Sequence, residues 1–300
     1  MEDPITHLEP GDARYPALLA TIPSPPALDV RGAFEPGDAL AIAIVGARQA
    51  TAYGLEVAES LAAELAARGV TIVSGLARGI DTAAHRGALD AGGRTIAVLG
   101  SGITRVYPPE NRLLAQKIFE RGAVVSQFPP DAEARPYHFP ARNRTLAGLA
   151  LGVVVVEAAE RSGALITAGL AGELGREVFA VPGRITSPAS RGANGLLRDG
   201  AKLVGHWSDI VAELAPPWRS MIAVDTLVNT TAPPAPGSDE GRMLELLSVD
   251  EPQHIERLIA RADVDAARAG AALTALELTG WARQLGGQRW VATGARARRA

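Results

Sequence analysis

Glycine, serine and arginine residues gather where short apolar runs give way to helical patterns. The first such segment contains Gly46 and Arg48, and the second contains Ser74, Gly75 and Gly79. Glycine permits the tight turns that such loops need, and the free N–H groups at the start of a following helix attract anions. A guanidinium group adds paired donors that match phosphate oxygens. These two segments therefore predict phosphate binding.

A third segment repeats the pattern with Gly100, Ser101 and Gly102, and a fifth places Ser162 and Gly163 before another helical stretch. Each segment follows an apolar run with the character of a strand. Parallel sheets bind ligands at the carboxyl ends of their strands. We therefore expect the first three loops to line one crevice.

The fourth segment changes the kind of ligand expected. It contains Phe139, Arg142, Asn143 and Arg144. Arginines hold a phosphate chain, whereas an aromatic face stacks on unpaired bases, and each such stack contributes about 1–3 kcal/mol. This segment favours an unpaired polynucleotide over a small nucleotide.

The chain contains few groups suited to catalysis. We weigh only Glu157 and Glu173 for acid–base work, and carboxylates of this kind more often cap helices or form ion pairs. Asp81 is expected to accept from backbone donors or to orient an arginine, and His85 to be structural. The sequence has no cysteine, no nucleophile–base pair, no metal-ligand cluster and no P-loop lysine. We expect no catalytic residue, cofactor or metal.

The elements that must position these loops alternate between strands and helices, which predicts an α/β fold with a doubly wound, mostly parallel sheet. The expected strands are Ile42–Val45, Val70–Val73, Thr95–Leu99, Ala123–Val125, Val153–Val156 and Glu177–Val181. The expected helices are Ala52–Ala67, Thr82–Ala91, Glu110–Glu120, Arg142–Leu149, Leu165–Leu174 and Ser208–Glu213. Residues 190–195 are expected to form a further loop on the same rim.

Changes in composition divide the chain into four parts. Residues 1–40 are a Pro-rich extended lead packed on the core, and residues 41–214 form the α/β domain. Residues 215–237 are rich in Pro, Thr and Ser and are expected to be a linker. Residues 238–300 show three helical patterns and a hairpin around Gly286-Gly287, which predicts a small winged-helix module.

Charge and hydropathy limit the environment. The 300 residues carry a net charge of −3, so a polyanion must be held by a local basic cluster. The longest apolar run, residues 149–156, is far shorter than the ~20 residues of a membrane span, and the first residues do not form a secretory signal. With no cysteine, the chain is expected to be soluble and cytoplasmic, with no membrane partner.

Five motifs occur in the order seen in the DNA-processing protein A family (DprA, also called Smf), and from about residue 15 to 213 the chain resembles that family. They are Val45-Gly46-x-Arg48, Ser74-Gly75 with Gly79-Ile80-Asp81, Gly100-x-Gly102 with Tyr107-Pro108 and Asn111, Phe139-Pro140-x-Arg142-Asn143-Arg144, and Ser162-Gly163-x-Leu165-Ile166-Thr167-Ala168. Any one motif is weak, but five in order are specific.

The resemblance implies an extended Rossmann-like domain that binds single-stranded DNA, forms a homodimer and helps to load the RecA recombinase on incoming strands in natural transformation. It also implies that the protein is not an enzyme. The implied DNA-binding residues are Gly46, Arg48, Ser74, Gly75, Gly79, Gly100, Ser101, Gly102, Phe139, Arg142, Asn143 and Arg144.

Two features depart from the family pattern. Many members begin with a helical module that a Pro-rich lead of about forty residues does not accommodate, so we expect that module to be missing. The expected recognition helix of the winged-helix module, Asp263–Thr279, carries Asp263, Asp265 and Glu277 against Arg268. Such a surface is poorly suited to phosphate, so we expect an auxiliary or protein-contact role for the module.

Two enzyme classes remain as alternatives. The sheet and glycine loops also resemble the lysine-decarboxylase-like phosphoribohydrolases, whose Pro-Gly-Gly-x-Gly-Thr-x-x-Glu stretch is replaced here by residues 161–167, Arg-Ser-Gly-Ala-Leu-Ile-Thr. An NAD-dependent oxidoreductase ranks last, because the chain lacks G-x-G-x-x-G and has no acidic residue after the strand Val70–Val73 to bind ribose.

Overall fold

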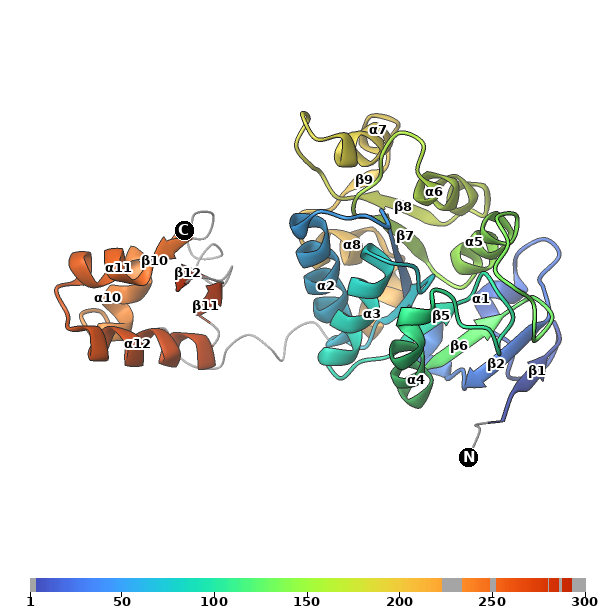
Figure 1. The fold of residues 1–300 in the computed structure, drawn as a ribbon, viewed down its shortest axis with the longest axis horizontal. Coiled ribbons are helices and arrows are strands. Elements are labelled where there is room, and N and C mark those ends of the chain that lie inside the picture. The colour runs from blue at the N-terminus through green and yellow to red at the C-terminus, as the bar shows by residue number, and fades with distance from the viewer. Residues whose placement is uncertain (1–3, 223–233, 249–251, 280, 286–287, 293–300) are drawn as a thin grey trace. The chain divides into compact units, whose positions relative to one another are not determined.

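The computed structural model describes residues 4–222, 234–248, 252–279, 281–285 and 288–292. The chain divides into two compact units, residues 1–223 and 224–300 (Figure 1). The central part of the linker expected at 215–237 and the expected Gly286-Gly287 turn lie outside the described residues. No helix in the described ranges is long and apolar enough to cross a bilayer.

The described part of the first unit contains a nine-stranded sheet in the order β1-β2-β6-β5-β4-β3-β7-β8-β9. Its strands are β1 (Thr6–Leu8), β2 (Leu28–Gly32), β3 (Ala41–Val45), β4 (Thr71–Ser74), β5 (Thr95–Val98), β6 (Ala123–Ser126), β7 (Gly152–Val155), β8 (Glu177–Ala180) and β9 (Lys202–Leu203). Neighbouring strands from β6 to β9 in this order are parallel. Strands β1 and β2 extend the β6 edge in antiparallel orientation.

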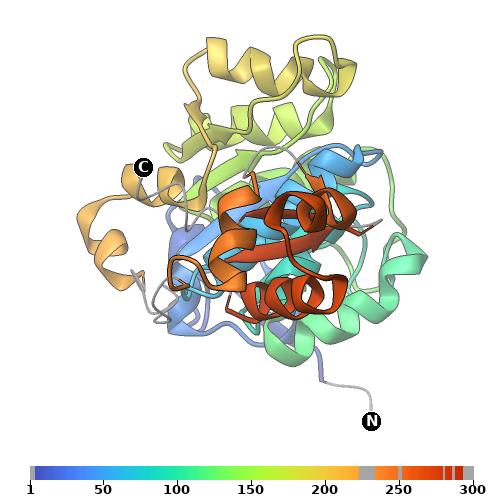
Figure 2. The same cartoon turned by 90° about the vertical axis from the view of Figure 1, so that its left-hand side faces the viewer.

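Helices cover both faces of the sheet (Figures 1 and 2). One face packs against α1 (Ala17–Ala20), α5 (His138–Gly148), α6 (Gly163–Glu173) and α7 (Arg191–Arg198). The other packs against α2 (Ala52–Ala66), α3 (Ile80–Asp90), α4 (Arg112–Arg121) and α8 (Trp207–Glu213). Strand β3 is apolar throughout because both of its faces are buried. Ala43 and Val45 belong to the first core, and Ile42 and Ile44 belong to the second.

The predicted fold class is confirmed, and the six predicted strands correspond to β3 to β8. Three differences are found at the margins. Strands β1, β2 and β9 were not predicted, and residues 191–198 form helix α7 where a loop was expected. Helix α9 (Pro216–Met221) occupies the start of the expected linker, because Ile222 packs into the core beside α8.

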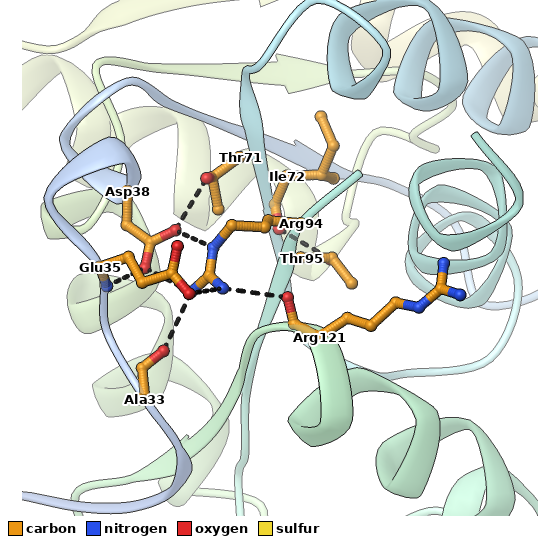
Figure 3. A network of polar contacts seen from close by, with 8 residues as sticks. All are labelled: Ala33, Glu35, Asp38, Thr71, Ile72, Arg94, Thr95 and Arg121. Carbon is orange, nitrogen blue, oxygen red and sulfur yellow. Dashed lines mark hydrogen bonds and ion pairs between the residues drawn. The ribbon is translucent and has the colours of Figure 1, made fainter. Parts of the chain in front are cut away.

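The lead before β3 contains the 3-10 helix η1 (Pro36–Ala39) and is fastened to the sheet by Arg94 (Figure 3). The Arg94 guanidinium donates to both carboxylate oxygens of Asp38, each at 2.9 Å, and to Glu35 at 2.7 Å. The hydroxyl of Thr71, at the start of β4, also donates to Asp38 at 2.8 Å. These bonds attach the lead at the end of the sheet where β4 and β5 begin.

The second unit has its own core. Its helices are α10 (Asp239–Leu246), α11 (Ile255–Ala262) and α12 (Ala266–Leu278), and its strands β10 (Gln253–His254), β11 (Ala282–Leu285) and β12 (Arg289–Ala292) form one small sheet. Met243, Leu258, Leu273 and Trp290 are buried together. This order of helices and strands agrees with the winged-helix prediction.

Candidate nucleic-acid interface

The order in which strands are added to the sheet reverses between β3 and β7. After β3 the chain adds β4, β5 and β6 on one side, and it then returns to add β7, β8 and β9 on the other. Open α/β sheets bind ligands at such a switch point, outside the carboxyl ends of the strands. A pocket of about 470 Å³ opens there, between the loops that follow β3 and β7.

Five of the twelve residues predicted to bind DNA line this pocket. They are Gly46, Arg48, Phe139, Arg142 and Asn143. They come from the loop after β3 and from α5, which lie about a hundred residues apart in the sequence. The convergence expected from the sequence therefore holds for these two segments.

Arg48 and Phe139 are in contact at the pocket. Arg48 is exposed, and its Cζ lies 4.8 Å from the centroid of the Phe139 ring. No ion pair with Arg48 occurs among the described residues. A guanidinium stacked on an aromatic ring keeps its N–H donors at the edge, where they are available to a phosphate.

Gly100 acts beneath this pair. A Cβ atom at Gly100 would lie 2.7 Å from Cδ1 of Phe139, a distance that real side chains do not tolerate. The ring of Phe139 therefore rests on the backbone at the end of β5. Gly100 does not line the pocket, but its lack of a side chain allows the Phe139 ring, which does line the pocket, to lie close to the backbone.

Arg142 is buried, so its guanidinium is not a solvent-exposed group that is free to bind phosphate. Its side chain is only 4% exposed, and Nη1 donates to the carbonyl oxygens of Gly75 and Val98. Burial lowers the pKa of Arg142 to about 10, so the group is still a cation at neutral pH. The guanidinium ties the ends of β4 and β5 together while it contributes positive charge to the wall of the pocket.

Asp81 orients the second loop, as predicted. Its Oδ2 accepts from the backbone N–H groups of Gly75 at 3.1 Å and Ala77 at 3.3 Å. Burial raises the pKa of Asp81, and the nearby charge of Arg142 opposes that shift. The same loop needs Gly79, which has a φ of +73° and would place a Cβ 2.3 Å from the carbonyl oxygen of residue 47.

The two predicted serines lie away from the pocket. Ser74 is fully buried and donates to the carbonyl oxygen of Ile44 at 2.6 Å. Ser101 is also buried and donates to the carbonyl oxygen of Arg105. Both hydroxyls are used to hold the loops in shape.

Gly102 and Arg144 are likewise outside the pocket lining. A Cβ at Gly102 would meet the carbonyl oxygen of Pro129 at 2.2 Å, whereas Arg144 donates to the carbonyl oxygen of Pro23 at 3.1 Å. Arg142 and Arg144 are two residues apart on α5, and positions with that spacing point to different sides of a helix. The structure therefore separates two arginines that the sequence motif places together.

The start of α6 supplies a wall of the pocket, although none of its residues is among the twelve predicted to bind DNA. Ser162, Gly163, Ala164, Ile166 and Thr167 line the pocket. Ser162 caps the helix by accepting from the N–H of Ala164 at 3.2 Å. The signal that identifies this wall was the Ser-Gly pair ahead of a helical pattern, and the free N–H groups of this first turn favour an anion.

Neither of the two acid–base candidates lines the pocket. Glu157 is 2% exposed and accepts from the backbone N–H of Thr51 at 2.9 Å and from its hydroxyl at 2.7 Å. Glu173 is exposed on α6 and does not line the pocket. Glu157 therefore anchors the start of α2, which is the structural role expected for it. No group of three or more potential metal ligands is found in the described ranges.

The fold and pocket define an α/β protein with a doubly wound sheet and an arginine- and aromatic-lined crevice at its switch point. A family model for DNA recombination-mediator protein A matches residues 6–215, and a model for the DprA winged helix domain matches residues 228–288. The chain belongs to the DNA recombination-mediator protein A family.

Relatives support this assignment. Protein Smf of Escherichia coli (strain K12) is 46% identical over 217 residues, which cover 71% of this chain and 58% of that protein. A crystal structure of DNA processing protein A from Streptococcus pneumoniae matches with a TM-score of 0.66 and 42% identity, over 70% of this chain and 75% of that one. A structure of DNA processing protein A from Helicobacter pylori, described for its single-stranded DNA binding mode, matches with a TM-score of 0.62 and 29% identity, over 70% of this chain and 94% of that one.

Proposed function

We propose that this protein binds single-stranded DNA at the switch-point pocket and acts as a recombination mediator that helps to load RecA on incoming DNA in natural transformation. The observation that carries the proposal is the exposed guanidinium of Arg48 stacked over Phe139 at the pocket. Family membership supports the same role. The proposal includes a homodimer and a cytoplasmic location.

The twelve residues divide into three groups under this proposal. Gly46, Arg48, Phe139 and Asn143 contact the strand directly, because they line the pocket and are not fully buried. Arg142 also faces the pocket and contributes charge from a buried position. The others shape the loops that hold these groups, namely Ser74, Gly75, Gly79, Gly100, Ser101, Gly102 and Arg144.

An unpaired strand fits this pocket better than a duplex. A ring at the surface can stack on a base only when the base is not already stacked and paired inside a helix. A cation beside the ring can hold the adjacent phosphate, as grooves that bind single strands do. The phosphoribohydrolase alternative would need a free carboxylate at the pocket, whereas Glu157 is buried and bound to Thr51 and Glu173 does not line the pocket.

The test is a competition among single-stranded oligonucleotide, duplex and nucleoside monophosphates for the purified protein. We expect single-stranded DNA to bind most tightly. Phe139→Ala is expected to lower that affinity by about tenfold, since a base–aromatic stack is worth about 1–3 kcal/mol. Arg48→Ala is expected to flatten the salt dependence by about 0.7 in the log–log slope, the value for one lost contact with a single-strand phosphate.

Two controls sharpen this test. Lys117→Ala removes an exposed cation on α4 that does not line the pocket, and it should leave both affinity and salt slope unchanged. The Phe139→Ala protein should also lose its stimulation of RecA filament formation on single-stranded DNA. The proposal fails if duplex or free nucleotide competes best, or if Arg48→Ala behaves like Lys117→Ala.

A further inference from the structure

A second aromatic ring continues the Arg48–Phe139 pair beyond the pocket. The ring centroids of Phe139 and Tyr107 are 6.3 Å apart, and their planes are inclined at 55°. Tyr107 is 40% exposed and belongs to the loop that follows β5, whereas Arg48 follows β3 and Phe139 lies on α5. Three segments distant in the sequence thus form a row of Arg48, Phe139 and Tyr107, which we call the stacking row.

The Tyr107 end of the stacking row differs from the Arg48 end in its charge. Arg78 lies near Tyr107 and forms an ion pair with Glu110. The charge of Arg78 is therefore balanced locally. What remains available at this end is the face of an aromatic ring, which suits a base better than a phosphate.

The row also has a fixed direction relative to the pocket. Phe139 lines the pocket, whereas Tyr107 does not. A strand that places one base near Phe139 meets Tyr107 only if it continues out of the pocket toward the loop that follows β5. Buried Leu99 and Ile103 hold the loop that carries Tyr107 against the core, so the ring has a rigid support.

We propose that Tyr107 is a second base-stacking position, which binds a nucleotide of the same single strand after it leaves the pocket. This inference rests on the proposed function. It adds a contact outside the pocket that only a strand longer than the pocket can make. Tyr107 is accordingly a determinant of how strongly affinity rises with strand length.

The experiment compares two oligothymidylates. One has about three nucleotides, and the other has about fifteen, which lies within the range of site sizes known for single-strand binding folds. Tyr107→Ala is expected to lower affinity for the longer strand by about tenfold and to leave affinity for the shorter strand within about twofold. Tyr107→Phe keeps the ring and should bind both strands like the unaltered protein, even though it lacks the hydroxyl group. Leu113→Ala, at an apolar side chain 75% exposed on α4, controls for the loss of exposed apolar surface.

A photochemical readout places the contact directly. A fifteen-nucleotide strand carrying 5-iodouracil should cross-link to the peptide that contains Tyr107. The cross-link should disappear in the Tyr107→Ala protein. In the Phe139→Ala protein it should still form at the same peptide. Equal losses for short and long strands, or no loss for the long strand, would overturn the inference while leaving the proposed function standing. If the unaltered protein binds neither strand, the proposed function itself fails.

Discussion

The ring of His85 is enclosed between α3 and β5, where its Nδ1 lies 2.7 Å from the hydroxyl of Thr95. That hydroxyl donates its own proton to the carbonyl oxygen of Ile72, also at 2.7 Å. Nδ1 of His85 must therefore carry the proton and donate, which leaves Nε2 as a buried atom without a hydrogen-bond partner in the described structure. Burial, reinforced by the charge of Arg142, lowers the pKa of His85 to about 3.

This lowered pKa predicts a specific loss of stability in acid. The ordinary pKa of histidine is 6.5, so between about pH 6.5 and pH 3 the unfolded chain takes up a proton that the native protein refuses. The contribution is intact above pH 6.5, and below it the free energy of unfolding falls by about 1.4 kcal/mol per pH unit. Urea unfolding at pH 7 and pH 5 measures this slope.

His85→Asn provides the matched control for that measurement. The amide can replace the Nδ1 hydrogen bond to Thr95 but has no group that titrates in this range. Other groups, including Asp81 with its raised pKa, contribute equally to both proteins and cancel in the comparison. Equal slopes for the two proteins would show that His85 is protonated in the native state and would contradict its burial as a neutral ring.

At the scale of elements, helix α5 decides which arginine serves the pocket. It begins at His138, four residues before the start expected from the sequence. Pro140 accounts for the difference, because a proline in the first turn of a helix removes an N–H that has no partner there. Phe139, Arg142 and Asn143 consequently share one helical face, whereas Arg144 leaves it.

This helix also shows how far sequence reasoning reaches. Residue types and their order were sufficient to predict that the loop after β3 and the segment of α5 come together, and both line one pocket. The direction of each side chain could not be predicted in this way. It depends on where α5 begins and on which backbone carbonyl oxygens accept hydrogen bonds from Arg142. The burial of Arg142 between β4 and β5 is a tertiary fact with no local signature.

The strands that sequence reasoning missed lie at the edges of the sheet. β2 does alternate, with Leu28 and Val30 buried and Asp29 and Arg31 partly exposed, but two prolines precede it and the segment resembles a loop. β9 has two exposed residues and is defined only by pairing with β8. Central strands can be recognised in the sequence by their continuous apolar runs, whereas the formation of short edge strands depends on pairing with neighbouring strands.

The link that Arg142 makes between β4 and β5 predicts a large cost of removing it. Arg142→Ala leaves two buried carbonyls without a donor and leaves Asp81 without its nearby cation, so the free energy of unfolding should fall by about 3 kcal/mol. Arg144→Ala, which removes a single bond to Pro23, should cost less than about 1 kcal/mol. Denaturant unfolding of the two variants tests this, and similar losses would show that Arg142 does not hold the strand ends together.

At the scale of the whole molecule, the two units have separate cores and differ in the groups that they offer to DNA. The pocket and the stacking row are built entirely from residues of the first unit. In the second unit, Arg268 of α12 donates to both carboxylate oxygens of Asp239 at 2.8 Å. This pairing further reduces the positive charge that α12 could offer to a phosphate backbone.

Removal of residues 224–300 should therefore leave binding to single-stranded DNA intact. The truncated chain keeps both cores of the sheet, including Ile222, and should unfold in one cooperative transition. We expect its affinity for single-stranded DNA to stay within about twofold of the full chain, because no pocket residue is lost. A drop of more than about tenfold in a protein that still unfolds cooperatively would instead place part of the binding surface in the winged-helix unit, against the charge pattern of α12.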